Sequence, residues 1–190
     1  ALALKSPRIL HIASHGFFDP EQPAADKQRP TAGQLLGVAN PSPLSEDPLL
    51  RSGIVLAGAN HPDADPNDDG HLTAAEITGM DLRQTELVTL SACETGLGSV
   101  RSGEGVYGLQ RALTVAGSRS TLLSLWKVDD EATAAFMTEF YRRLMAGEGR
   151  ADALRSTQAA FRTHSNKLYQ DVYVWGAFQL TGDWRPLSAR

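Results

Sequence analysis

Short apolar runs alternate with amphipathic stretches along this chain. The apolar runs have the length of a strand, and they lie at residues 9–13, 52–57, 87–92, 121–126 and 172–180. Apolar side chains recur every three or four positions in three other stretches, residues 106–116, 130–146 and 151–163. Strands that alternate with amphipathic helices are typical of a doubly wound, mostly parallel sheet. We therefore expect an α/β fold.

Two of the predicted strands end at a side chain capable of catalysis. The run at 9–13 leads to His15 and Gly16, and the central run at 87–92 leads to Cys93. The carboxyl ends of neighbouring parallel strands lie at one edge of a sheet, where open α/β sheets bind ligands. If the two runs are neighbours in one parallel sheet, a histidine and a cysteine face each other across a crevice.

The size of the chain is consistent with one domain over residues 1–190. With 190 residues, of which 42% are hydrophobic, the chain buries one substantial core, and a second independent domain is not expected. The run at 9–13 is apolar almost throughout, as in a strand covered on both sides. Such a strand normally has neighbours on both flanks, so we expect further strands before residue 1 and a longer polypeptide.

Charge and cysteine content narrow the classes of function. The formal net charge of −4 leaves no basic surplus for a phosphate backbone, so nucleic acid is not an expected partner. No apolar run approaches the about 20 residues that span a bilayer, so a membrane is not expected either. With a single cysteine no internal disulfide forms, which suits a reducing compartment such as the cytoplasm. A lone cysteine with histidines elsewhere is a candidate nucleophile.

The chemistry of such a pair is acyl transfer. A free thiol has a pKa of about 8.5, so Cys93 needs a base to form the nucleophilic thiolate, and His15 is the candidate. Gly16 lacks a Cβ, so its N–H can approach a substrate oxygen closely, and the N–H groups of Gly16 and Cys93 together suit an oxyanion hole. An isolated cysteine is more often a small buried hydrophobe, so catalysis and packing both remain open from the pattern alone.

A second pattern lies at residues 65–76, which fit the spacing of a calcium loop with Asp65, Asn67, Asp69, Gly70 and Glu76. The alternative is an Asp-Gly turn followed by a capping box from Thr73 to Glu76 that begins a short helix. The residues before Asp65 indicate strand and loop rather than the entering helix of an EF-hand, which favours the turn.

Three further histidines, His11, His61 and His71, are interpreted as structural. His11 precedes the end of its strand, where it shares a face with Ala13 and His15 if the strand stays extended, and we interpret it as a hydrogen-bonded histidine of the sheet. His61 and His71 lack a second pair of ligands at zinc spacing. We expect no metal site and no cofactor.

Several motifs occur in an order that resembles a known family. They are HIASHGFFD, DGHLTAAEI, ELVTLSACETGLG, GEGVYGLQRALTVAGSRSTLLSLWKVDDEAT and WGAFQLTGDW. The series is similar to the CHAT domain, a caspase-like cysteine peptidase module related to separase and often attached to tetratricopeptide repeats. The resemblance implies a caspase-like, three-layer α/β/α fold with a mostly parallel sheet. It also implies a catalytic dyad of His15 and Cys93, with Gly16 and Cys93 supplying the oxyanion N–H groups.

The resemblance to separase extends to substrate recognition. The residues after Trp126 are similar to separase's Trp-x-Val-x-Asp segment, in which an aspartate helps to recognise a basic P1 residue. On that basis Asp130 is the candidate for the S1 pocket, with Trp126 or Trp175 as an apolar wall. The alternative is that Asp130 caps a helix and that both tryptophans pack in the core.

Together these features predict a cysteine endopeptidase that hydrolyses a partner protein through an acyl-enzyme. The long loop at residues 17–50 is a plausible gate, and an attached repeat region a plausible regulator. The rival interpretations are a non-catalytic interaction domain with a closed site, a calcium-binding module, and an acyltransferase that uses the same nucleophile.

Overall fold

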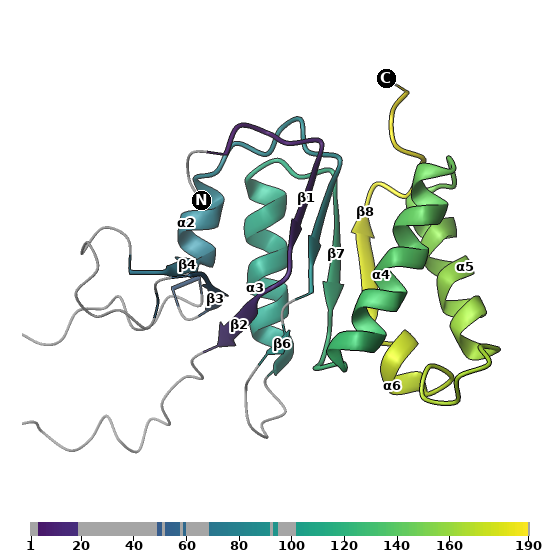
Figure 1. Cartoon of the computed structure of the whole chain (residues 1–190). Helices are drawn as coiled ribbons and strands as arrows, with labels where there is room; N and C mark the ends of the chain where they lie inside the picture. The colour runs from purple at the N-terminus through teal and green to yellow at the C-terminus, as the bar shows by residue number, and fades with distance from the viewer. Residues whose placement is uncertain are drawn as a thin grey trace, which may run out of the picture.

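The computed structural model describes residues 4–18, 49–50, 52–57, 59, 69–91, 93–94 and 102–189 (Figure 1). The strands are β1 (Ile9–Ile12), β2 (His15–Phe18), β3 (Ser52–Val55), β4 (His71–Thr73), β5 (Leu87–Leu90), β6 (Cys93–Glu94), β7 (Ser120–Ser124) and β8 (Phe178–Gly182). The helices are α2 (Ala74–Thr78), α3 (Ser102–Val115), α4 (Asp130–Met145), α5 (Arg150–Arg162) and α6 (Val172–Trp175). Most of the predicted gate at residues 17–50 lies outside the described residues. Among those described, no helix combines the length and apolar composition that crossing a membrane requires.

The main sheet has the strand order β1-β5-β7-β8. The first three strands are parallel to one another, and β8 is antiparallel to β7. Every residue of β5 and β7 is buried, as their continuous apolar sequences predict for strands covered on both faces. This arrangement confirms the expected α/β fold with a mostly parallel sheet.

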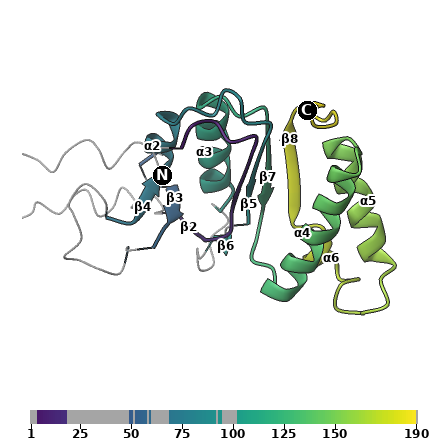
Figure 2. The same cartoon turned by 45° about the horizontal axis from the view of Figure 1, so that its top comes forward.

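Helices cover both faces of this sheet (Figure 2). Because side chains alternate along a strand, Leu87 packs with α4 and α5, whereas Val88 packs with α2 and α3. Leu122 and Leu123 divide in the same way between the two faces of β7. The result is the three-layer arrangement that the resemblance implied.

A second, smaller sheet has the order β4-β3-β2-β6. Here the structure differs from the expectation of one continuous strand ending at His15, because the chain breaks after Ile12 and β2 belongs to the second sheet. The hydroxyl of Ser14 donates to the carbonyl oxygen of Val55 at this break, and β2 pairs antiparallel with β3. Pairing with β3 therefore places β2 in the second sheet rather than in the main sheet.

The expected strand at residues 172–180 is also partly wrong. Residues Val172–Trp175 form the short helix α6, and only Phe178–Gly182 form a strand. The side chain of Asp171 accepts a hydrogen bond from the Tyr173 N–H at 2.9 Å and so caps this turn. Because the chain then re-enters the sheet from the other end, β8 runs antiparallel to β7.

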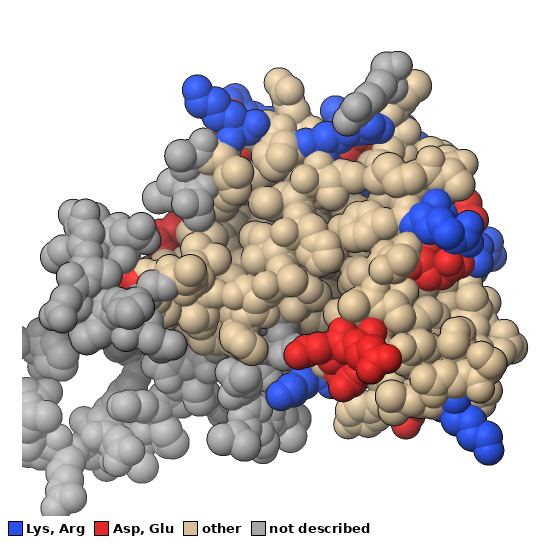
Figure 3. Space-filling view, viewed as in Figure 1, with Lys and Arg blue, Asp and Glu red and all other residues tan. Residues whose placement is uncertain are grey.

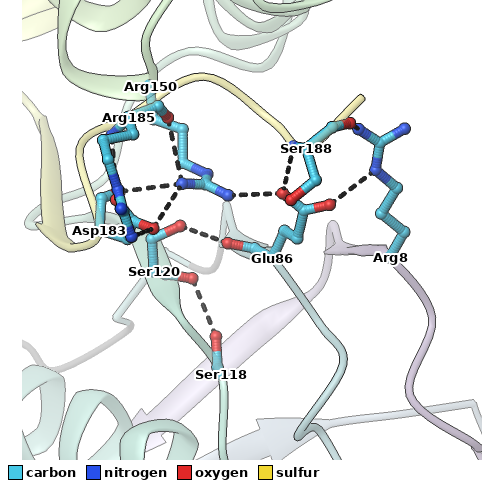
Figure 4. Close-up of polar contacts among 8 residues, drawn as sticks. All are labelled: Arg8, Glu86, Ser118, Ser120, Arg150, Asp183, Arg185 and Ser188. Atoms are coloured by element: carbon cyan, nitrogen blue, oxygen red, sulfur yellow. Dashed lines mark hydrogen bonds and ion pairs between the residues drawn. The ribbon is translucent and has the colours of Figure 1, made fainter. Parts of the chain in front are cut away.

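A buried ionic cluster ties the carboxyl-terminal segment to the amino ends of the strands (Figure 4). Glu86, 5% exposed, accepts hydrogen bonds from Arg8, Arg150 and the Ser188 N–H, and Arg150, 1% exposed, also pairs with Asp183 at 3.3 Å. Burial opposes ionisation of Glu86, but the Ser188 N–H and the Arg8 guanidinium outweigh it, so the pKa of this carboxyl lies below its usual value. The cluster lies at the end of the sheet opposite His15.

Candidate active site

His15 and Cys93 pair directly across the parallel ladder of β2 and β6. The next pair in the ladder joins Gly16 and Glu94. The His15 side chain is exposed, whereas Gly16 is buried. The two apolar runs lead to His15 and Cys93, and the structure places these two residues side by side on neighbouring strands.

The pairing follows from the register of the main sheet. Ile12 pairs with Leu90 at the end of the β1–β5 ladder, and three residues further along each strand His15 pairs with Cys93. The Ser91 N–H donates to the Ile12 carbonyl oxygen at 3.1 Å, which extends the ladder to the break. The segment that contains β1 and β2 and the segment that contains β5 and β6 therefore pass from the main sheet to the second sheet in the same register.

A cleft of about 420 Å³ lies beside His15, between the carboxyl ends of the strands and the beginning of α4. Its described lining is His11, Ala13, Ser14, His15, Ser91, Ser124, Val128, Asp130, Thr133, Ala134 and Met137. Val128 and Met137 are buried and apolar, whereas Asp130 is exposed and acidic. The cleft thus combines an apolar wall, an imidazole and a carboxylate.

Asp129 and Asp130 have different positions at the beginning of α4. The Asp129 carboxylate accepts a hydrogen bond from the Ala132 N–H at 3.1 Å and so caps the helix. Asp130 is the first helical residue and lines the cleft. Figure 3 shows an acidic surface (red) over the start of α4, where Asp129, Asp130 and Glu131 follow one another. The residue that caps α4 is therefore Asp129 and not Asp130.

Sequence comparison agrees with this architecture. A family model described as the CHAT domain matches residues 1–183, which is nearly the whole chain. The chain belongs to the CHAT domain family. Human tetratricopeptide repeat protein 28 is 30% identical over 125 residues, and the mouse protein of the same name is 32% identical over 112 residues. These matches cover 66% and 58% of the CHAT domain described here, but only 5% and 4% of the two relatives.

Trp126 and Trp175, which were predicted as an apolar wall in this CHAT domain, are not among the described residues that line the cleft. The Trp126 indole N–H donates to the Tyr173 carbonyl oxygen at 2.7 Å, and the Trp175 indole N–H donates to the Gln170 carbonyl oxygen at 3.0 Å. Both rings pack against the core that α4 and α5 share with the sheet. These contacts agree with the packing alternative. Among the described residues, Val128 and Met137 are the buried apolar side chains that line the cleft.

Sequence reasoning missed several lining residues of the CHAT domain cleft, notably Val128, Met137 and Ser91. His11 was interpreted only as a histidine of the sheet, but it lines the cleft together with His15. Its Nε2 lies 3.4 Å from the Ser91 hydroxyl oxygen, and partial burial lowers the pKa of its imidazole. The signal that pointed to it was the alternation that places His11, Ala13 and His15 on one side of the chain.

The calcium pattern of this CHAT domain falls partly on Asp65 and Asn67, which lie outside the described residues. Within the described part, Glu76 accepts hydrogen bonds from the Thr73 N–H and hydroxyl, both at 2.8 Å, in a capping box that begins α2. Asp69 accepts from the His71 N–H at 2.9 Å. No group of three or more potential ligands for a metal gathers among the described residues. The capping box confirms that part of the turn interpretation.

Proposed function

We propose that this CHAT domain is a cysteine endopeptidase with Cys93 as nucleophile and His15 as base and acid. The observation that carries the proposal is the direct pairing of these residues on adjacent parallel strands, beside a cleft at the strand ends. That edge of an open α/β sheet is the usual location of a ligand site.

The proposed reaction proceeds through an acyl-enzyme. His15 accepts the proton of the Cys93 thiol, and the thiolate adds to the carbonyl carbon of a peptide bond. As the C–N bond breaks, His15 returns the proton to the leaving amine. His15 then takes a proton from water, whose oxygen attacks the thioester, so that a carboxylic acid and the free thiol are regenerated.

The backbone at the paired residues suits the developing negative charge. The N–H groups of Gly16 and Cys93 are the proposed donors to the tetrahedral oxyanion, and Gly16 has no side chain to obstruct its approach. One such donor typically contributes about 3 kcal/mol of transition-state stabilisation.

The lining of the cleft suits a substrate with a basic P1 side chain. Val128 and Met137 offer apolar contact to an aliphatic stem, and Asp130 offers a carboxylate to its charged end. The acidic surface at the beginning of α4 favours approach of the same kind of substrate.

The proposed partners are a protein substrate and a region of tetratricopeptide repeats that controls access to the cleft. The names of the human and mouse relatives support the association with repeats. A reducing compartment such as the cytoplasm is the proposed location, because the mechanism needs Cys93 as a free thiol.

Profiling of cleavage sites in a proteome, with the natural chain against Cys93→Ala, tests the proposal. We expect new termini that follow Lys or Arg with the natural chain and none with Cys93→Ala. A peptidyl acyloxymethyl ketone, which labels only an activated thiol, provides a second readout on purified protein. Identical termini in both samples, together with no labelling of Cys93, would contradict the peptidase and favour a non-catalytic interaction domain.

A further inference from the structure

The cleft contains a second imidazole that the proposed mechanism does not use. His11 lies on β1, four residues before His15. Both histidines line the cleft together with Asp130. The His11 ring lies 5.6 Å from the Tyr141 ring, and its Nε2 lies 3.4 Å from the Ser91 hydroxyl oxygen. The side chain is thus held on the side of the cleft formed by β5 and α4.

The charged and titratable groups that face His11 are few among the described residues. They are His15 from β2 and Asp130 from α4, which line the same cleft, and Tyr141 from α4. Burial raises the pKa of Tyr141, and its hydroxyl donates to Thr89 at 2.8 Å, so the phenol stays neutral. Asp130 therefore supplies a carboxylate to the cleft, and His11 is the imidazole there whose pKa burial lowers.

We propose that His11 is a specificity-determining residue of the substrate cleft, which admits a lysine or arginine side chain while its imidazole is neutral and repels it once protonated. The proposal rests on the peptidase function proposed above and adds a control of its selectivity. Asp130 attracts the cationic side chain, and a neutral His11 leaves that attraction intact. His11 and Asp130 are both exposed residues that line this cleft, so a protonated His11 places a positive charge beside the cationic side chain and offsets the attraction of Asp130.

The direction of the pKa shift of His11 determines the pH range in which selectivity changes. Burial lowers the pKa of His11 from the ordinary value of 6.5, so the imidazole is neutral at pH 7 and becomes charged only in more acidic solution. Selectivity for basic side chains should therefore be greatest near neutral pH and decline below pH 6.5.

Two acyloxymethyl ketone probes that differ only in P1, lysine in one and norleucine in the other, test this inference. The ratio of their second-order rates of labelling Cys93 removes effects on the reactivity of the thiol itself, because these are common to both probes. For the natural chain we expect the ratio to fall about tenfold between about pH 7.5 and about pH 5. In His11→Gln and His11→Asn the ratio should stay constant over that range, because neither amide titrates.

Asp130→Asn is the matched control, in which the ratio should be low at every pH. A pH-independent ratio in the natural chain, or an unchanged decline in both His11 variants, would overturn the role of His11 and leave the peptidase standing. Failure of both probes to label the natural chain would instead contradict the peptidase, and the inference about His11 with it. Nuclear magnetic resonance of the imidazoles gives a readout that needs no turnover, since bound benzamidine should lower the pKa of His11 further.

Discussion

His15 of β2 and Cys93 of β6 face each other across a parallel ladder, three residues beyond the pairing of Ile12 with Leu90. The register of the backbone sets their proximity. Substitution of either side chain should therefore alter chemistry without altering the fold.

His15 is the proposed general base. His15→Gln should slow labelling of Cys93 by an uncharged peptidyl electrophile by about 100-fold or more, because general base catalysis typically contributes at least that factor. The exposed position of His15 predicts an unchanged midpoint of urea unfolding. His164→Gln is the control, since His164 lies beside Phe161 and Tyr169 in a different cavity between α4 and α5. Equal labelling rates in the two variants would remove His15 from the mechanism.

Substitution of Asp129 should affect stability, whereas substitution of Asp130 should affect selectivity for the P1 side chain. Loss of the cap in Asp129→Ala should reduce the free energy of unfolding by about 1 kcal/mol. Asp130→Ala should cost only about 0.3 kcal/mol through the helix dipole, but it should lower the rate with a lysine P1 probe about tenfold. Urea unfolding and labelling kinetics of both variants check this. If Asp130→Ala lost stability and kept selectivity, its role would be structural.

Arg150 should contribute far more to stability than an exposed arginine on the same helix. Arg150→Met leaves the buried Glu86 carboxylate short of one partner, and we expect a loss of about 3 kcal/mol. The exposed pair of Arg155 with Asp152 is the control, and Arg155→Met should change the free energy of unfolding by about 0.5 kcal/mol or less.

The double variant Glu86→Gln with Arg150→Met completes the thermodynamic cycle. It should lose less stability than the sum of the single variants, because it removes both buried charges. Additive losses would show that the two residues act independently. Labelling of Cys93 should be unaffected in all these variants, since the cluster lies at the opposite end of the sheet.

Stability should also depend on pH through His11. Its pKa is lower in the folded chain than the ordinary 6.5, so the unfolded chain binds more protons as the pH falls below 6.5. The free energy of unfolding should thus be fully retained above pH 6.5 and decrease in more acidic solution. Glu86 and Glu139 also have lowered pKa values, but their effect begins only near the ordinary value of 4.5. Urea midpoints between pH 7 and pH 5 should therefore decline in the natural chain and stay flatter in His11→Gln.

The regular elements were predictable where local chemistry decides them. The continuous apolar sequence of β5 and β7 and the capping box of Thr73 with Glu76 agree with the predictions from the sequence. The helix at 172–175 was missed because four apolar residues have no distinguishable period, and the cap from Asp171 decided the conformation.

By itself the sequence determined the alternation of the strands β1, β5 and β7 with the helices α3, α4 and α5, the α/β class and the pair of residues at which two apolar runs end, because these depend on local periodicity and on residue type. Only the tertiary structure decided that the β1–β2 and β5–β6 segments pass from the main sheet to the second sheet in the same register. It also decided that Asp129 rather than Asp130 caps α4, and that His11 lines the cleft. Those features depend on register and on packing between residues far apart in the chain, where a shift of one residue along a strand would turn each side chain to the opposite face.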